Sequence, residues 1–174
     1  IDLMQVHSLA DWQTQLPILK ERKAQGIYRY IGITASREEL YEDFIEIMRR
    51  EPLDFIQINY SVAERKAEEV ILPLAMDRGM AVFINRPFVA GALFPYVANK
   101  TLPDWATEFD CYSWGQFFLK FILSHPAVTV ALQATSSPAH LVDNLKAGQG
   151  LLPNEEFRQR MVNLIGLTGR PPWV

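Results

Sequence analysis

Strand-like apolar runs recur along this chain at a nearly constant interval, and each run ends in a polar residue. These polar residues are His7, Thr34, Asn59, Asn85 and Gln133, and only the last interval is longer than the others. A helix-like segment follows each run. Strand and helix alternating at this spacing predict βα units that feed a parallel sheet. Because chemistry collects at the carboxyl ends of parallel strands, the polar residues are the first candidates for a site.

The same pattern predicts where the elements lie. We expect strands at residues 1–7, 28–34, 55–61, 81–88 and 128–133, and a final helix at 154–167 beyond the repeat. Ser8, Ser36 and Ser137 are predicted to cap the helices that follow them, because a serine hydroxyl can accept a hydrogen bond from a free backbone N–H of the first turn.

Apolar side chains at helical spacing predict the core. The stripes are Leu40/Phe44/Ile47 and Trp114/Phe117/Phe121. Each stripe lies on one face of its helix, so we interpret both as core faces rather than ligand contacts. Residues 89–112 are rich in Gly, Pro and aromatic side chains, and a loop of that length in a compact domain predicts a functional loop or lid.

Composition narrows the class of protein. The 174 residues carry a net charge of −3 and a single cysteine, Cys111. We expect one domain over residues 1–174, with no basic field for nucleic acid or an anionic membrane surface. No apolar run approaches the ~20 residues of a membrane helix, and the three histidines show no metal-ligand spacing. A lone cysteine suits a reducing compartment, so we expect a cytoplasmic protein.

Five segments at the strand ends together resemble one family. They are DLMQVH (2–7), GIYRYIGIT (26–34), QINYS (57–61) with Arg65 and Glu68-Glu69 after it, RPF to GAL (86–93), and TSSPAHLVDNL (135–145). In this order they are similar to strands four to eight of the aldo-keto reductases. The resemblance implies an α/β fold, a partial (β/α)8 TIM barrel, and NAD(P)H-dependent reduction of a small aldehyde or ketone by hydride transfer.

His7 is the candidate catalytic residue. The resemblance gives it the place of the histidine in the family's Asp-Tyr-Lys-His tetrad, where it would polarise the substrate carbonyl oxygen. Spacing alone favours a strand-end histidine satisfied by its neighbours. No residue here matches the tetrad's Asp, Tyr or Lys. Because the chain begins at Ile1 inside a strand-like run, we expect a truncated barrel that is inactive by itself.

Three positions are candidates for the nicotinamide end of the coenzyme. The resemblance implies that Thr34 and Gln57 bind the carboxamide, which has both a donor and an acceptor. Ala35 stands where the family usually has Asn, so one contact is expected to be lost. Asn85 stands where many members have an aromatic ring stacked on the nicotinamide, and an amide has no such π face.

Arg86, Phe88 and Gly91 match the loop after the family's seventh strand. Arg86 stands where Ser is common. Its guanidinium could pair with the coenzyme diphosphate or with an acidic substrate. An ion pair with a neighbouring carboxylate explains the residue equally well.

The segment after the last strand is the candidate site for the adenosine end. Its predicted contacts are Thr135, Ser136, Ser137, His140, Asp143 and Asn144. Hydroxyls beside a helix start form an anion site, which in this family receives the 2′-phosphate of NADP. Simple capping would also explain Ser137. His140 stands where the family often has Arg, so NADP is the expected coenzyme and NAD the alternative.

Three functions stay open. The first is an NAD(P)-linked carbonyl reductase, of which this chain is the carboxyl-terminal part. The second is a non-catalytic coenzyme-binding or regulatory barrel. The third is a half-barrel that dimerises through its exposed strands. We expect the strands near residues 3–6 and 128–132 to be unpaired on one side, so the partner is either a missing amino-terminal half or a second copy.

Overall fold

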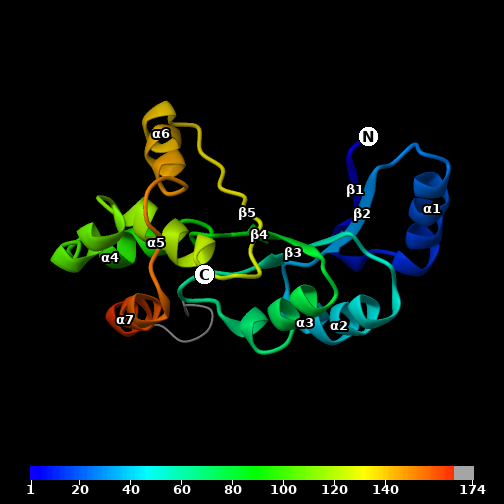
Figure 1. Ribbon diagram of the computed structural model, residues 1–174, viewed down its shortest axis with the longest axis horizontal. Helices are drawn as coiled ribbons and strands as arrows, with labels where there is room; N and C mark the ends of the chain where they lie inside the picture. Colours follow the sequence, from blue (N-terminus) through cyan, green and yellow to red (C-terminus); the bar gives the residue numbers. More distant parts are fainter. Residues whose placement is uncertain (167–174) are drawn as a thin grey trace.

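The computed structural model describes residues 1–166 and contains one five-stranded parallel sheet. The strands are β1 (Leu3–Val6), β2 (Tyr30–Thr34), β3 (Phe55–Asn59), β4 (Ala81–Asn85) and β5 (Val130–Ala131). They lie side by side in chain order, and every neighbouring pair is parallel (Figure 1). The predicted parallel order is therefore confirmed. Strands that never reverse their order are the arrangement of a barrel wall, not of a doubly wound sheet.

Helices follow the strands as the pattern predicts. They are α1 (Trp12–Ala24), α2 (Tyr41–Arg50), α3 (Ile71–Asp77), α4 (Leu93–Val97), α5 (Trp114–Leu123), α6 (Pro138–Lys146) and α7 (Glu155–Ile165). Short 3-10 helices occupy His7–Leu9, Glu38–Leu40, Lys66–Glu68 and Asp104–Phe109. Segment 89–112 thus contains α4 and a 3-10 helix, where the sequence predicted only a loop. The predicted end of the final helix, Leu167, lies outside the described residues.

Alternate strand residues divide the sheet into two faces. Val6, Ile33, Ile58 and Ile84 are fully buried and belong to the face packed against the helices, of which α2 and α3 lie beneath the sheet in Figure 1. Fully burying such a side chain contributes about 1.5–3 kcal/mol. On the opposite face Gln57 and Phe83 are half-buried, whereas Phe55 is buried.

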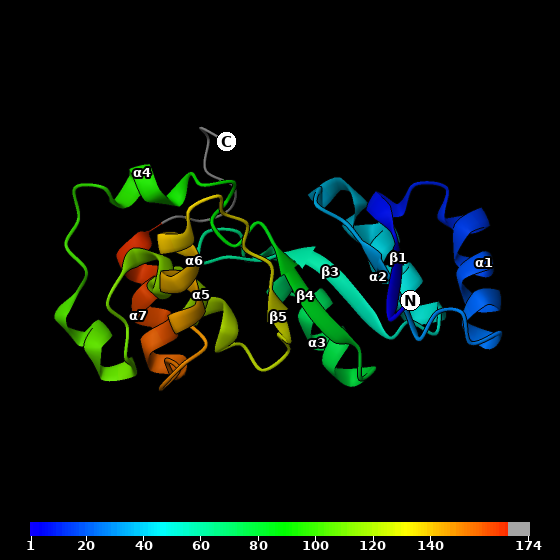
Figure 2. The same ribbon diagram turned by 90° about the horizontal axis from the view of Figure 1, so that it is seen from above.

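The sheet is an open arc among the described residues. In its strand order, β1 and β5 are the two outer strands and have one neighbour each. Figure 2, seen from above, shows the arc running from β1 to β5, with α1 beyond one edge and α4 to α7 gathered beyond the other. Eight strands close a barrel of this type, so the predicted partial barrel is what the chain forms.

Arg158 fixes α7, the helix outside the βα repeat, to the wall. Its side chain is buried. The guanidinium donates to the Ser124 hydroxyl at 2.9 Å, to the Tyr60 hydroxyl at 2.7 Å and to the Glu68 carboxylate at 2.9 Å. The Tyr60 hydroxyl donates to the same carboxylate. Burial raises the pKa of Tyr60 above its ordinary value, so the phenol stays protonated and continues to donate.

Candidate functional site

The loop after β4 is strained. Arg86, Val89 and Ala90 have φ angles of 54°, 53° and 54°, and Gly91 has 90°. Residues other than glycine rarely adopt the left-handed region, and the β-branched Val89 does so at particular cost. Hydrogen bonds from Val89 N to Arg86 O at 2.9 Å and from Gly91 N to Phe88 O at 2.9 Å hold the loop. Strain of this kind, about 1–3 kcal/mol per residue, is characteristic of ligand clamps.

Several buried polar atoms near the strand ends have no hydrogen-bond partner among the described residues. They are Gln5 Oε1, Asn59 Oδ1, Asn85 Oδ1 and Arg86 Nε. Leaving such an atom unpaired costs about 1–3 kcal/mol, so native proteins rarely do so without a reason. Asn85 and Arg86 are consecutive and sit where β4 gives way to the strained loop. The end of β4 is therefore a point where the described part of the fold leaves two consecutive polar side chains with an unsatisfied atom.

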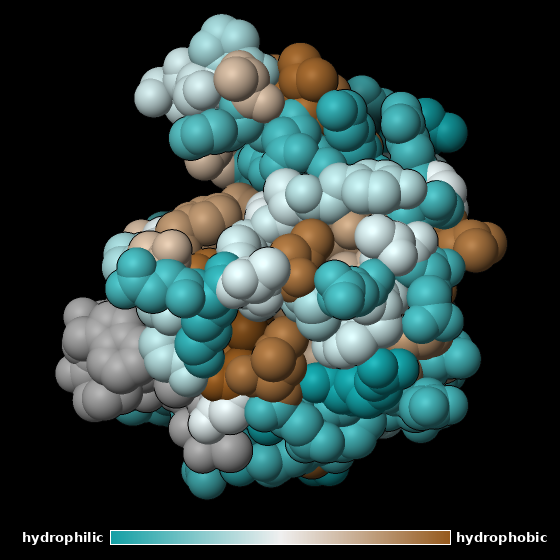
Figure 3. Space-filling view, turned by 90° about the vertical axis from the view of Figure 1, so that its left-hand side faces the viewer, coloured by the Kyte–Doolittle hydropathy of each residue, from teal (hydrophilic) through white to brown (hydrophobic). Residues whose placement is uncertain are grey.

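A cavity of about 830 Å³ opens beside that loop. Its walls come from the loop after β4, the start of α4, the start of α5, the segment after β5, and α6. Figure 3 shows the molecule from this end, with a notch below the uppermost lobe. A cavity of this size and mixed lining suits a cofactor.

The cavity brings together many of the predicted coenzyme residues. Arg86, Phe88, Gly91, Thr135, His140, Asp143 and Asn144 all line it. These residues lie far apart in the chain: some are in the loop after β4, and the others are in the segment after β5 and in α6. Their meeting is expected, because ligand sites form at the carboxyl ends of parallel strands.

Other predicted residues lie outside the cavity lining. Thr34 and Gln57 sit on neighbouring strands, in register with each other. Gln57 Oε1 accepts a hydrogen bond from Gln5 Nε2 at 2.9 Å, which satisfies its carbonyl and leaves its amide nitrogen to donate. Asn85 ends β4 next to the lining residue Arg86. His7 is exposed in the 3-10 turn after β1.

The serines before α6 have different roles. Ser137 Oγ accepts from the backbone N–H of His140 at 3.3 Å and caps the helix. Its own backbone N–H donates to Thr135 Oγ1 at 3.1 Å. Ser136 is exposed and outside the cavity lining. The capping alternative for Ser137 is therefore present in the structure, and its hydroxyl is already used.

Asp143 and Asn144 are held by internal hydrogen bonds. The Asp143 carboxylate accepts from Ser113 Oγ at 2.5 Å and from Gln116 Nε2 at 2.6 Å, which ties α6 to the start of α5. Asn144 Nδ2 donates to Gln133 Oε1 at 2.8 Å. Both side chains still line the cavity. Each can therefore offer a ligand only those hydrogen-bonding positions that the internal bonds do not occupy.

Sequence reasoning missed an aromatic wall. Phe94 and Trp114 line the cavity together with the predicted Phe88, and the Phe88 and Phe94 ring centroids are 4.9 Å apart. Trp114 also packs against the core as predicted, since its ring centroid lies 5.1 Å from that of Phe117. The unusual aromatic content of segment 89–112 was the one signal that could have indicated Phe94.

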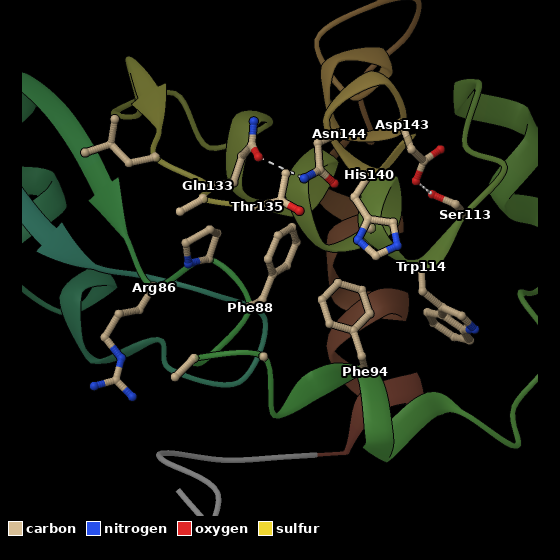
Figure 4. A pocket seen from close by; sticks show the side chains of 16 residues that line it. Arg86, Phe88, Phe94, Ser113, Trp114, Gln133, Thr135, His140, Asp143 and Asn144 are labelled. Atoms are coloured by element: carbon tan, nitrogen blue, oxygen red, sulfur yellow. Dashed lines mark hydrogen bonds between the residues drawn. The ribbon is translucent and has the colours of Figure 1, made fainter. Parts of the chain in front are cut away.

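Among the described residues that line the cavity, only Arg86 and Asp143 have a side chain with a permanent charge. Arg86 makes no ion pair within the described part of the chain, so the carboxylate partner considered from sequence is not found there. In Figure 4 its guanidinium points away from the aromatic side chains, while Phe88, Phe94 and His140 converge. The cavity therefore has a cationic edge at the β4 loop and an anionic side chain on α6.

Residues 1–166 contain neither a candidate metal site nor a candidate membrane span. No group of three or more His, Cys, Asp or Glu side chains is placed to hold a metal ion. No helix in that range is long and apolar enough to cross a bilayer.

Comparison with known proteins agrees with this geometry. The model of the aldo/keto reductase family matches residues 1–161. The chain belongs to that family. An uncharacterised oxidoreductase of Schizosaccharomyces pombe is 27% identical over 90% of this chain and 50% of its own length. The NADH-specific methylglyoxal reductase of Escherichia coli is 28% identical over 70% of this chain and 38% of its own length.

Solved aldo-keto reductases share the fold of this chain. A Klebsiella pneumoniae enzyme in complex with NADP and acetate superposes with a TM-score of 0.76 at 22% identity, covering 98% of this chain and 62% of that one. The holo form of the Bacillus halodurans enzyme AKR11C1 gives 0.72 at 22% identity, covering 95% and 60%. The chain thus spans half or less of the two curated relatives and about three fifths of these structures.

Proposed function

We propose that this chain supplies the coenzyme-binding wall of an aldo-keto reductase that reduces a small aldehyde or ketone with NADPH or NADH. The observation that carries the proposal is the unpaired Arg86 Nε, in a strained loop at the edge of the 830 Å³ cavity. A guanidinium with an unused donor beside a cavity fits an anionic diphosphate. The NADP complex and the NADH-specific name among the relatives support a dinucleotide.

We assign the roles of individual residues from the hydrogen-bonding atoms that each can offer to a ligand. The coenzyme, when bound, supplies the hydride. Arg86 holds the diphosphate, and the free amide nitrogen of Gln57 and the hydroxyl of Thr34 orient the carboxamide. His7 donates a hydrogen bond to the carbonyl oxygen of the substrate, where negative charge grows during reduction. No residue of this chain matches the family's proton donor, so the isolated chain is expected to bind coenzyme without turnover.

The setting of the site completes the proposal. One apolar core runs from Val6 in β1 to Ile165 in α7, which supports a single domain. The free thiol of Cys111 is buried, which suits the reducing cytoplasm.

A coenzyme-binding barrel without catalysis is the second candidate. It is favoured by the position of His7, which is exposed and outside the cavity lining. In this reading the Arg86 site binds the dinucleotide and no hydride is transferred.

Coenzyme titration and an activity assay test the proposal together. NADPH or NADH should quench tryptophan fluorescence, because Trp114 lines the cavity. Arg86→Met should weaken binding about tenfold or more, the worth of a charge-assisted hydrogen bond. Arg50→Met, which removes an exposed arginine from α2, is the matched control and should leave affinity unchanged.

The outcomes separate the candidates. Absence of binding by the wild type, or equal affinities for Arg86→Met and the control, would overturn the coenzyme role. Turnover of an aldehyde by a longer form that contains the tetrad, lost in His7→Ala, supports the reductase. Binding without turnover in such a form supports the second candidate.

A further inference from the structure

One wall of the cavity is built for a flat ring. Phe88, Phe94 and Trp114 line it, and Figure 4 shows the His140 imidazole beside the same group. The Trp114 indole N–H donates to the carbonyl of Lys100 at 3.2 Å, and its ring stacks on that of Phe118 while still lining the cavity. Bases stack on aromatic side chains of this kind in nucleic-acid complexes.

The side chains of the β5–α6 segment supply polar edges. Asn144 Nδ2 donates to Gln133 Oε1 at 2.8 Å. This bond fixes both amides and leaves Gln133 Nε2 as a donor and Asn144 Oδ1 as an acceptor. A base or ribose, which carries both donors and acceptors without charge, matches this pair.

The charge at this end of the cavity is negative. Asp143 is the charged lining residue on α6, and two short hydrogen bonds hold its carboxylate in place. Lys146 lies in the last turn of α6, and the ammonium of Lys100 lies over the Tyr96 ring at 4.2 Å. Neither lysine lines the cavity. A phosphate monoester placed here would lose water beside a carboxylate and gain no lysine or arginine partner from the described residues at this end, which is unfavourable in a low-dielectric site.

We propose that this cavity selects a dinucleotide with a free ribose 2′-hydroxyl and discriminates against a 2′-phosphate. The inference rests on the proposed coenzyme function and concerns only its nucleoside end. NADH is then the preferred form, and the specificity-determining features are the Asp143 carboxylate and a histidine in place of arginine or lysine at position 140.

Nucleotide fragments test the nucleoside end without the rest of the barrel. Calorimetric titration of the 174-residue chain with ADP and with 2′,5′-ADP should show ADP binding at least about tenfold tighter. NADH and NADPH should follow the same order. Affinity for 2′,5′-ADP equal to or tighter than that for ADP would overturn the inference and leave the proposed function standing. If neither fragment nor either dinucleotide binds, both are wrong.

Paired arginine substitutions locate the selectivity. His140→Arg places a cation at the cavity lining and should tighten 2′,5′-ADP by about tenfold with little change for ADP. Ala139→Arg adds the same charge at the preceding exposed position, outside the lining, and should tighten 2′,5′-ADP far less. Equal gains from both variants would show only general electrostatic attraction and would contradict the assigned site.

Discussion

Burial controls the chemistry of single side chains in this fold, and Cys111 shows it most simply. The side chain is fully buried, and desolvation raises the pKa of its thiol from 9.0 to about 11. Ellman's reagent should therefore react slowly with the folded chain and quickly with the unfolded chain, because the thiolate is the reactive form. Rapid reaction of the folded protein would contradict this burial.

The same shift predicts a pH dependence of stability. Between pH 9.0 and about 11 the unfolded chain loses the Cys111 proton while the folded chain retains it. The unfolded state then binds fewer protons, so the free energy of unfolding falls as pH rises through this window. Urea unfolding at several pH values should show a shallower decline for Cys111→Ala than for the wild type. Parallel curves would show that the thiol contributes nothing to the slope.

At the residue scale, the sequence predicted which residues line the cavity better than it predicted which of their hydrogen-bonding atoms remain unpaired. Asp143 and Arg86 both lie in family-like motifs, yet Asp143 is held by two hydrogen bonds and Arg86 Nε has none within residues 1–166. A motif records residue type and position. The partner that saturates Asp143 comes from α5, about thirty residues away, and only the folded chain brings the two together.

Capping residues set the elements that form the cavity. Ser113 and Ser137 begin α5 and α6, and each hydroxyl accepts a backbone N–H bond. Ser137→Ala should reduce the free energy of unfolding by about 1 kcal/mol. Ser113→Ala should cost about 2 kcal/mol, because this hydroxyl also donates to Asp143. Ser136→Ala, an exposed serine without a cap role, is the control and should change stability by less than about 0.5 kcal/mol in urea titrations.

Equal losses in Ser113→Ala and Ser137→Ala would contradict the extra tie between α5 and α6. A loss in Ser136→Ala as large as in the other two would show that the method does not separate caps from surface serines.

Element positions followed from periodicity, whereas two of the predicted caps were wrong. Ser8 lies in a 3-10 turn with φ of 53°, and α1 begins after Asp11 instead. Ser36 precedes a 3-10 helix whose N-cap is Arg37. An N-cap serine needs an extended backbone. Ser8 instead has a positive φ, in a turn that buries Leu9. Ser137 was predicted correctly because Pro138 favours a helical first turn.

At the scale of the whole molecule, the arc was predictable, whereas the aromatic wall of its cavity was not. Repeated βα spacing specifies neighbouring parallel strands, since each unit can pack only beside the previous one. The aromatic wall depends on how the β4–α5 connection folds back, which places Phe88, Phe94 and Trp114 along one cavity. No local pattern encodes that return, so the sequence indicated Phe88 from its motif and Trp114 only as a core residue, and it did not indicate Phe94.

The open arc leads to the last prediction, that the 174-residue chain associates with itself. β1 and β5 each expose one unpaired edge in the described sheet, and unpaired parallel edges favour pairing with another chain. Head-to-tail pairing of β5 with β1 of a second copy would continue the sheet in parallel. Sedimentation velocity should therefore show a sedimentation coefficient that rises with protein concentration.

A charge on the open face should separate edge association from general stickiness. Leu3 lies in β1, in register with the exposed Tyr30, so its side chain is on the same face as Gln57 and away from the helices. Leu3→Lys should shift the chain toward monomer, because association would bury the new ammonium. Ile18→Lys makes the same change on α1, where the side chain is 47% exposed on the helical layer, and should leave association unchanged. A wild-type chain that stays monomeric at every concentration, or equal shifts in the two variants, would place the contact elsewhere than the β1 edge.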